Sequence, residues 1–159
     1  MDSRRAYLDA LRMLGRRELS EAQIRQRLAR REHDPEAIDG AVAQLIEERA
    51  IDDNRVAQAI ARLETGVRKR GKLRVRRKIE SAGISPATAK RALDEVFGNL
   101  DDDDLLEAAL AKRLRRGSGV GDDRDFNRLY RYLVGQGFEP QRVLALLRKH
   151  RRGIRDHED

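Results

Sequence analysis

Apolar residues recur along the chain in one pattern that appears three times. In the first unit, Ile24 and Leu28 precede Pro35, and Ile38 and Val42 follow it. A shift of 51 residues carries this pattern onto Val75, Ile79, Pro86, Ala89 and Leu93, and a further shift of 54 carries it onto Leu129, Leu133, Pro140, Val143 and Leu147. Because apolar residues four apart lie on one face of an α-helix, each unit predicts a helix, a short turn and a second helix.

The turn between the two helices is marked by glycine and proline. Gly83 and Gly137 each stand three residues before a proline, where glycine favours the left-handed conformation that ends many helices. Proline suits the first position of the following helix, because the N–H group that it lacks has no partner there. The first unit has Glu32 in place of the glycine, so we expect a looser turn. We interpret His33, the next residue, as a turn residue.

Polar residues mark the predicted helix starts. Asp34 and Ser85 directly precede prolines, and both residue types are good N-caps. Ser20 and Gln23 form an S-x-x-Q capping box at the start of the helix that contains Ile24.

A further helix precedes each pair, which gives three helices per unit. It is marked by Leu8, Leu11 and Leu14 in the first unit, by Ile60 and Leu63 in the second, and by Leu106, Leu110 and Leu114 in the third. Acidic residues at 52–53 and 101–104 favour the positive end of the helix dipole and open two of these helices. The glycine-rich segment 117–121 predicts a longer, flexible link in the third unit.

We therefore predict an all-α fold of three tandem three-helix repeats in an elongated, curved modular array, since each repeat contacts mainly its neighbours. The predicted repeats cover 1–51, 52–99 and 100–152, and a charged C-terminal tail follows at 153–159. Composition agrees with small helical units, because 40% of the residues are charged and only 4% are aromatic. Disorder is the competing interpretation of so much charge, and the regular apolar positions argue against it.

The residue types present exclude several kinds of site. The chain has no cysteine, which excludes disulfides, thiolate zinc sites and cysteine nucleophiles. His33, His150 and His157 have no partners at metal-ligand spacing, and no phosphate-binding loop or nucleophile motif is present. The run 101–104 fits a solvated helix start, with a divalent-metal cluster as the alternative. We expect a protein that is not an enzyme and has no cofactor.

The hydropathy of the chain bears on its location. No apolar run approaches the roughly 20 residues that span a bilayer, and the first residues lack the apolar core of a signal peptide. We therefore expect a soluble, cytoplasmic protein that does not associate with membranes.

Positive charge is the strongest functional feature. The formal net charge is +7, which favours anionic partners. The densest basic stretch comprises Arg68, Lys69, Arg70, Lys72, Arg74, Arg76, Arg77 and Lys78. A secondary basic surface comprises Arg25, Arg27, Arg30 and Arg31, and a third group comprises Arg113, Arg115, Arg116, Arg148, Lys149, Arg151 and Arg152. We expect the stretch 68–78 to bind a polyanionic or acidic partner, phosphates being bound through counterion release, with a solvated, salt-bridged helix surface as the alternative.

Recognition of base edges is not favoured. Each unit has the two-helix spacing of a helix-turn-helix, but the helix after Pro35 carries Glu36, Asp39, Glu47 and Glu48, and a recognition helix that faces DNA should not be acidic. The aromatic residues are too few for stacking on single strands.

Three stretches resemble the RecX family, the bacterial regulators of the RecA recombinase. The first is SEAQIRQRLARREHDPEAIDGAVAQLIEERAIDDNRVAQAIARL, in which Ser20, Ile24 and Leu28 match, followed by Asp53 and Arg55 in IDDNRVA. The stretches RGKLRVRRKIESAGI and LYRYLVGQGFEPQRVLALL are similar to the second and closing repeats of the family. The resemblance covers roughly residues 6–150, and the order of the motifs makes it specific.

The resemblance implies a regulator that binds in the groove of the RecA–DNA filament. It also implies that the protein limits filament growth, ATP hydrolysis, strand exchange and co-protease activity, without catalysis of its own. The expected partners are the RecA nucleoprotein filament and DNA phosphates within that complex, and we expect a monomer. The alternative is a basic helical DNA-binding module that acts independently of RecA.

Overall fold

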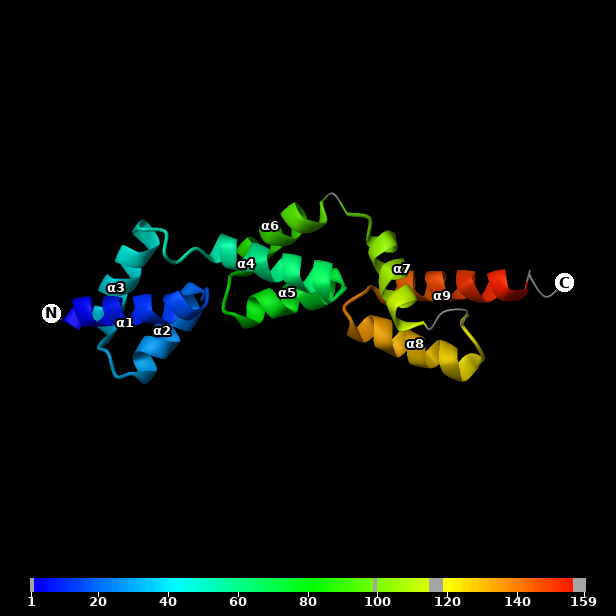
Figure 1. The fold of residues 1–159 in the computed structure, drawn as a ribbon, viewed down its shortest axis with the longest axis horizontal. Helices are drawn as coiled ribbons and strands as arrows, with labels where there is room; N and C mark the ends of the chain where they lie inside the picture. The colour runs from blue at the N-terminus through cyan, green and yellow to red at the C-terminus, as the bar shows by residue number, and fades with distance from the viewer. Residues whose placement is uncertain (1, 99, 115–118, 156–159) are drawn as a thin grey trace. The chain divides into compact units, whose positions relative to one another are not determined.

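The part of the chain that the structure describes is helical. The structure is a computed structural model that describes residues 2–98, 100–114 and 119–155, with side chains as far as residue 151. These ranges contain nine α-helices, one short π-helix and no strand (Figure 1), so the predicted all-α fold is confirmed. The helices are α1 (Asp2–Arg16), α2 (Glu21–Arg30), α3 (Pro35–Glu47), α4 (Asp53–Arg62), the π-helix η1 (Leu63–Val67), α5 (Lys72–Ser81), α6 (Pro86–Phe97), α7 (Asp102–Arg113), α8 (Asp123–Gly135) and α9 (Pro140–Arg155).

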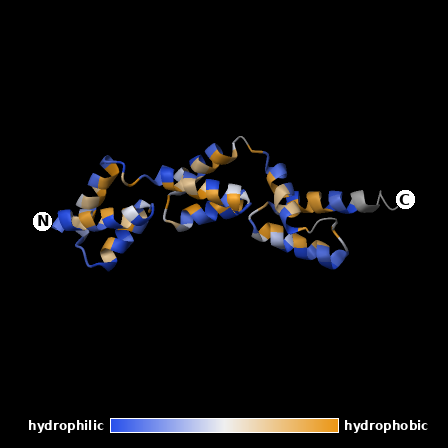
Figure 2. Cartoon of the chain, in the orientation of Figure 1, coloured by the Kyte–Doolittle hydropathy of each residue, from blue (hydrophilic) through white to orange (hydrophobic). Residues whose placement is uncertain are grey.

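The apolar positions of the threefold pattern lie in the interior, as predicted. Apart from the three prolines, none of these residues is more than 7% exposed. In repeat 1, Ile24, Leu28 and Val42 belong to one core cluster, which the helices α1, α2 and α3 enclose. In repeat 3, Leu133 and Val143 belong to the cluster of α7, α8 and α9. Figure 2 shows the amphipathic pattern behind this packing, with apolar and polar residues mixed along each helix.

The predicted first helix of repeat 1 is present as α1, but two of the leucines that mark it lie outside the core. Leu8 and Leu11 are 41% and 36% exposed, whereas α1 buries Ala6, Ala10 and Met13. The main neighbour of α1 is α3, and small alanine side chains let two helices lie close together at native packing density.

The predicted first helices of the other repeats are present as α4 and α7. In repeat 2, Leu63 is 47% exposed and Ile60 is half-buried, while Val56, Ala57 and Ala61 are buried. In repeat 3, Leu106 and Leu110 are each 1% exposed, and Leu114 is half-buried against the same core.

The three turns share one backbone conformation. Gly83 and Gly137 have φ angles of 78° and 102°, and Glu32 has a φ of 64° at the equivalent position. The expected looser turn in repeat 1 was therefore wrong, because Glu32 adopts the left-handed conformation despite its side chain. His33 lies in this turn as predicted, and its Nε2 atom also lies 2.7 Å from a carboxylate oxygen of Asp9 in α1.

The helix starts are capped largely as expected. The Ser20–Gln23 capping box is complete, with both hydrogen bonds present. The Ser85 hydroxyl accepts from the backbone N–H of Thr88 at 3.2 Å. Asp34 differs, since it has extended backbone angles at the N-cap of α3 but its side chain makes no capping hydrogen bond. Pro35 leaves α3 with one fewer N–H group that needs a cap.

The chain divides into two compact units that each combine parts of neighbouring repeats. One consists of Met1–Ile60 and Lys78–Ala92, and the other of Ala61–Arg77 and Leu93–Asp159. The predicted repeat boundaries describe sequence units and stay predictions. Each compact unit contains a junction between two repeats, and these junctions position the candidate site.

The junction in the first unit joins α2 to the turn before α6. The Ser20 hydroxyl donates to the carbonyl oxygen of Ala82, and Ser20 is fully buried. The backbone N–H of Glu21 donates to Asp53 at 2.9 Å. A side chain on Gly83 would clash with Ala22, so this position needs glycine for its space as well as its positive φ.

The junction in the second unit joins the start of α5 to the turn before α9. The Gly71 N–H donates to the carbonyl oxygen of Gln136 at 2.7 Å, and the Leu73 N–H donates to Gly137 at 3.1 Å. A Cβ atom on Gly71 would lie 2.6 Å from the backbone nitrogen of Phe138. The start of α5 is therefore held by direct contact between two backbones.

Candidate functional site

The predicted basic stretch begins directly after η1, passes through a short loop and includes most of α5. Its eight residues divide into two sets once their contacts are known. One set makes structural contacts within its own unit and comprises Arg68, Arg70 and Arg74. The other set comprises the remaining members of the stretch: Lys69, Lys72, Arg76, Arg77 and Lys78.

Arg68 and Arg70 neutralise a buried carboxylate. Glu64 is 2% exposed and belongs to η1. The Arg68 guanidinium donates to it at 3.0 Å, and a nitrogen of Arg70 lies 3.7 Å from its second oxygen. Because an unpaired buried carboxylate is strongly unfavourable, these two arginines stabilise the local fold. The backbone of Lys69, between them, has a positive φ of 54°.

Arg74 belongs to the second junction. Its Nη1 atom donates to the carbonyl oxygen of Gly135 at 3.2 Å. Its Cβ and backbone nitrogen occupy the space that a side chain on Gly137 would need. Arg74 is therefore a packing residue of the repeat junction, which limits how far its charge is available to a partner.

The outward part of α5 presents the remaining cations. Lys72, Arg76, Arg77 and Lys78 are exposed, while Val75 and Ile79 are fully buried and lie on the side of the helix opposite Arg77. Within the described ranges, no ion pair involves Lys72, Arg77 or Lys78. A helix face with such charges attracts anions at a distance set by salt screening.

Exposed apolar side chains accompany these cations. Leu73 lies four residues before Arg77, on the same side of α5, and is 43% exposed. Leu63 and Val67, four apart in η1, are 47% and 67% exposed. The chain thus presents both apolar and cationic side chains between Leu63 and Lys78, a combination that suits a protein surface better than a phosphate backbone alone.

The arginines of the predicted secondary basic surface differ in their contacts. Arg25 pairs with Asp39 at 2.6 Å and lies 3.8 Å from Glu21. Arg27 and Arg30 instead face α1 across a cavity, which we call the arginine cavity. Its charged lining consists of Arg12, Arg16, Arg17, Arg27, Arg30 and Arg31.

The α1 members of the arginine cavity were missed from the sequence. Arg12, Arg16 and Arg17 lie near the end of α1, where cations interact favourably with the helix dipole. The signal that could have found them is their spacing, since residues four apart share a helix face. The turn that follows α1 then returns the chain as α2, which brings Arg27 and Arg30 to the same cavity.

Two members of the third basic group, Arg113 and Arg151, make local contacts, while Arg148 and Lys149 are exposed. The guanidinium of Arg113 lies 4.6 Å from the centre of the Tyr132 ring. Arg151 pairs with Asp123 at 2.7 Å and lies 5.4 Å from the Phe126 ring centre. Arg115, Arg116 and the side chain of Arg152 lie outside the described residues.

The acidic residues at the start of α7 cap this helix and form an ion pair with α9. The Asp101 side chain accepts from the backbone N–H groups of Asp103 and Asp104. Asp103 pairs with Arg142 of α9 at 3.0 Å, and its hydrogen bond raises the pKa of the Arg142 guanidinium. Among the described residues, no group of three or more His, Cys, Asp or Glu is arranged to hold a metal ion.

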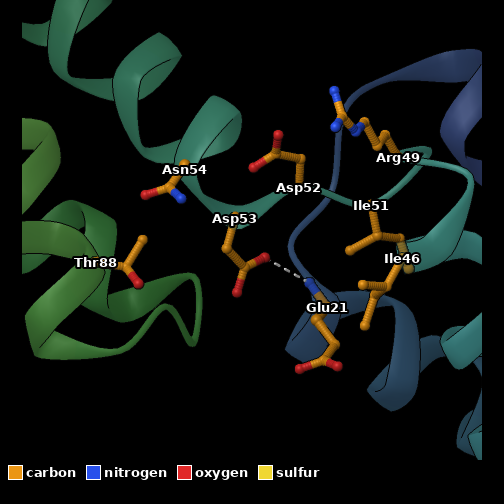
Figure 3. Close-up of a pocket in the computed structure, with 8 residues that line it drawn as sticks. All are labelled: Glu21, Ile46, Arg49, Ile51, Asp52, Asp53, Asn54 and Thr88. Carbon is orange, nitrogen blue, oxygen red and sulfur yellow. Dashed lines mark hydrogen bonds between the residues drawn. The ribbon is translucent and has the colours of Figure 1, made fainter.

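A second cavity lies beside the first repeat junction and is shown in Figure 3. Its volume is about 350 Å³, and its lining comprises Glu21, Ile46, Arg49, Ile51, Asp52, Asp53, Asn54 and Thr88. Its two aspartates are already used, since Asp52 accepts from the Arg55 N–H at 3.2 Å and Asp53 accepts from the Glu21 N–H. These bonds cap α4 and α2, so the carboxylates serve the fold.

None of the described helices combines enough length with enough hydropathy to cross a bilayer.

Sequence comparison identifies relatives along most of the chain. The sequence model described as the first three-helix domain of RecX matches residues 6–45. The protein named "Regulatory protein RecX" in Halorhodospira halophila is 33% identical over 139 residues, which cover 86% of this chain and 82% of the relative. The protein of the same name in Chromohalobacter salexigens is 32% identical and covers 85% of this chain and 86% of its own.

Solved structures agree on the fold. The crystal structure of RecX from Lactobacillus salivarius superposes with a TM-score of 0.77 at 19% identity, covering 93% of this chain and 96% of that one. A second crystal structure, described as regulatory protein RecX, has a TM-score of 0.74 at 18% identity, and the match covers 93% of this chain and 72% of that one. These likenesses support the three-helix repeat architecture.

Proposed function

Because the chain belongs to the RecX family of regulatory proteins, we propose that it regulates the RecA recombinase, chiefly as an inhibitor. In this proposal the protein binds in the groove of the RecA–DNA filament. It limits filament growth, ATP hydrolysis, strand exchange and co-protease activity, and it performs no catalysis of its own. The filament and the DNA phosphates within it are the partners.

The outward cations of α5 carry this proposal. Lys72, Arg77 and Lys78 are exposed and make no ion pair within the described residues. The start of the same helix is fixed by the backbone contacts of Gly71 and Leu73. Exposed cations on a helix with a fixed start can bind DNA phosphates or acidic side chains with little loss of backbone freedom.

The exposed apolar residues favour a protein partner beside the DNA. Leu63, Val67 and Leu73 would gain by burial against a protein, at about 25 cal/mol for each Å² removed from water. Naked DNA offers few apolar surfaces for them outside the thymine methyl groups. This observation favours a nucleoprotein filament over DNA alone.

The direct test is the ATPase activity of RecA on single-stranded DNA as this protein is titrated in. We expect the rate to fall to a low plateau when the protein is added to preformed filaments. An unchanged rate at an excess of the protein would overturn the proposed function.

Charge-reversal variants distinguish a specific role of the α5 cations from an effect of the net charge of the chain. The double variant Lys72→Glu, Arg77→Glu should require at least tenfold more protein for half-inhibition, because two charge-assisted contacts are lost and reversed. The matched control is Lys90→Glu, Lys112→Glu, which changes the charge equally at exposed positions of α6 and α7. Equal loss in both double variants would remove α5 from the site and leave the regulatory role standing.

The alternative is a DNA-binding module that acts without RecA, and the dense exposed charge of α5 is the feature that favours it. It predicts tight binding to free DNA with a steep salt dependence. Fluorescence anisotropy of labelled DNA, with and without RecA across a salt series, distinguishes the two. Weak binding to free DNA at physiological salt, together with strong binding to filaments, would exclude the alternative.

A further inference from the structure

The arginine cavity lies between the last turns of α1 and α2. It has a volume of about 540 Å³, within the range of roughly 300–1,000 Å³ that is typical of ligand sites. Six arginines line it, and Met13 supplies the remaining, apolar part of the lining. Arg16, Arg27 and Arg30 belong to the last turns of their helices, where the helix dipole favours positive charge.

The charge of this cavity is not balanced by the protein. The nearby carboxylate is Asp9, which lies 3.5 Å from Arg12 and 3.6 Å from Arg31 and also bonds to His33. For the other four arginines, Arg16, Arg17, Arg27 and Arg30, the described residues provide no ion-pair partner. Like charges gathered around one cavity repel one another, and an anion bound among them removes that repulsion.

The chemistry of the lining selects the anion. Guanidinium groups present paired N–H donors that match two oxygens of one phosphate, and they keep their charge at any physiological pH. The lining contains no aromatic ring on which a base could stack and no amide or hydroxyl that could read a base edge. The volume exceeds what one phosphate group fills, and the arginines come from two helices.

We propose that the arginine cavity binds a run of consecutive phosphate groups, independently of base sequence. The phosphates of a single nucleic-acid strand and those of a free linear polyphosphate share this chemistry. The site is separate from the cations of α5, and the proposal does not rest on the regulation of RecA.

The test measures binding of two probes to the full-length chain. One is a labelled single-stranded oligodeoxythymidine followed by fluorescence anisotropy, and the other is inorganic tripolyphosphate followed by calorimetry. The variant is Arg16→Gln, Arg17→Gln, Arg30→Gln, in which all three residues are exposed, so the fold should be kept. The matched control is Arg4→Gln, Arg5→Gln, Arg91→Gln, which removes three exposed charges elsewhere in the same unit.

We expect the cavity variant to bind the oligonucleotide at least tenfold more weakly than the control variant does. The slope of log K against log salt should become shallower by about 2, since each phosphate contact on a single strand contributes about 0.7. Arg27→Gln, on α2 alone, should give a smaller loss in the same direction, with a slope change of about 0.7. Thermal melting followed by circular dichroism checks that each variant is folded.

The outcomes distinguish the sources of the phosphates. If the cavity variant loses binding of both probes, the cavity is a site for any run of phosphates. If the wild-type chain does not bind tripolyphosphate and the cavity variant loses binding of the oligonucleotide, the ligand is a nucleic-acid strand. Equal weakening in the cavity and control variants would overturn the proposal, since only the net charge would then matter. Binding of polyglutamate at the cavity, with neither phosphate probe bound there, would also overturn it and assign the cavity to acidic protein segments.

Discussion

The buried hydroxyl of Ser20 donates to the carbonyl oxygen of Ala82, a residue 62 positions further along the chain. The repeat shifts of 51 and 54 carry this pair onto Gly71 and Gln136, whose backbone groups are hydrogen-bonded at 2.7 Å. Consecutive repeats are therefore joined twice through the same pair of positions. A side-chain hydroxyl makes the first bond, and a backbone N–H makes the second.

Ser20→Ala should destabilise the protein more than the loss of an ordinary helix cap. Loss of the N-cap alone removes about 0.5–2 kcal/mol. In addition, the Ala82 carbonyl loses its buried donor, which costs about 1–3 kcal/mol. We therefore expect a total decrease in the free energy of unfolding of about 1.5–5 kcal/mol, measured by urea denaturation.

Ser85→Ala is the matched control for this substitution. Ser85 is also a capping serine, but it is exposed and its hydroxyl bonds only within the start of α6. Its loss should decrease the free energy of unfolding by about 1 kcal/mol. If both substitutions destabilise the protein equally, the Ser20–Ala82 bond does not stabilise the junction.

Gly71→Ala should disrupt the second junction. The new Cβ would meet the backbone atoms of Gly137 and Phe138, which cannot turn away as a flexible side chain can. Overpacking of this kind typically destabilises by about 1–3 kcal/mol. Gly135→Ala is the control, because a Cβ there meets nothing within 4 Å and the residue lies in α8. It should be neutral or stabilise by about 0.4–1 kcal/mol in the same denaturation experiment.

Much of the repeat architecture is predictable from the sequence, because it depends on local rules. The prolines, the capping box and the apolar pairs four apart identify helix starts and buried faces without knowledge of the fold. The interior face of α1 is different, since Ala6 and Ala10 are buried for their small size against α3. The close fit of two helices depends on the side-chain sizes in both of them. The apolar pattern of one helix alone therefore does not predict it.

The sequence predicted which segment carries the candidate site, but it did not predict which cations of that segment make contacts within the protein. The stretch 68–78 reads as uniform positive charge in the sequence. Its division depends on Glu64, a buried carboxylate that forms ion pairs with Arg68 and Arg70. The arginine cavity was hidden for a related reason, since its charge comes from two helices that a turn brings together.

Arg70→Ala and Arg77→Ala should have opposite effects on stability and function. Removal of Arg70 leaves the buried Glu64 with Arg68 as its single ion-pair partner among the described residues. The free energy of unfolding should fall by about 1–3 kcal/mol, because the buried carboxylate loses one of its two described ion-pair partners. Removal of the exposed Arg77 should change it by less than about 0.5 kcal/mol.

In the RecA ATPase assay, Arg77→Ala should have the larger effect and Arg70→Ala the smaller one, which is the reverse of their effects on stability. Arg77→Ala should weaken inhibition, while Arg70→Ala should inhibit normally at a temperature where it is folded. Stability measured by denaturation and inhibition measured on the same preparations give the comparison. If Arg70→Ala weakens inhibition as strongly as Arg77→Ala does, both residues contact the filament and the division of the stretch is wrong.

Asp9 should make the stability of repeat 1 depend on acid pH. The hydrogen bond from His33, together with the charges of Arg31 and Arg12, lowers the pKa of Asp9 against the opposing effect of partial burial. A carboxylate whose pKa is lower in the folded state stabilises the fold above its unfolded pKa of about 3.9, and this contribution is lost as the pH falls through the folded pKa. Asp9→Asn removes the contribution at every pH.

The difference in unfolding free energy between wild type and Asp9→Asn should therefore be largest above about pH 5 and vanish towards about pH 2. Urea denaturation across this range measures it. In a His33→Gln background the pH-dependent part of the difference should shrink, because the largest cause of the lowered pKa is absent. A difference that stays constant across the whole range would show that Asp9 acts through packing, with no contribution from its charge.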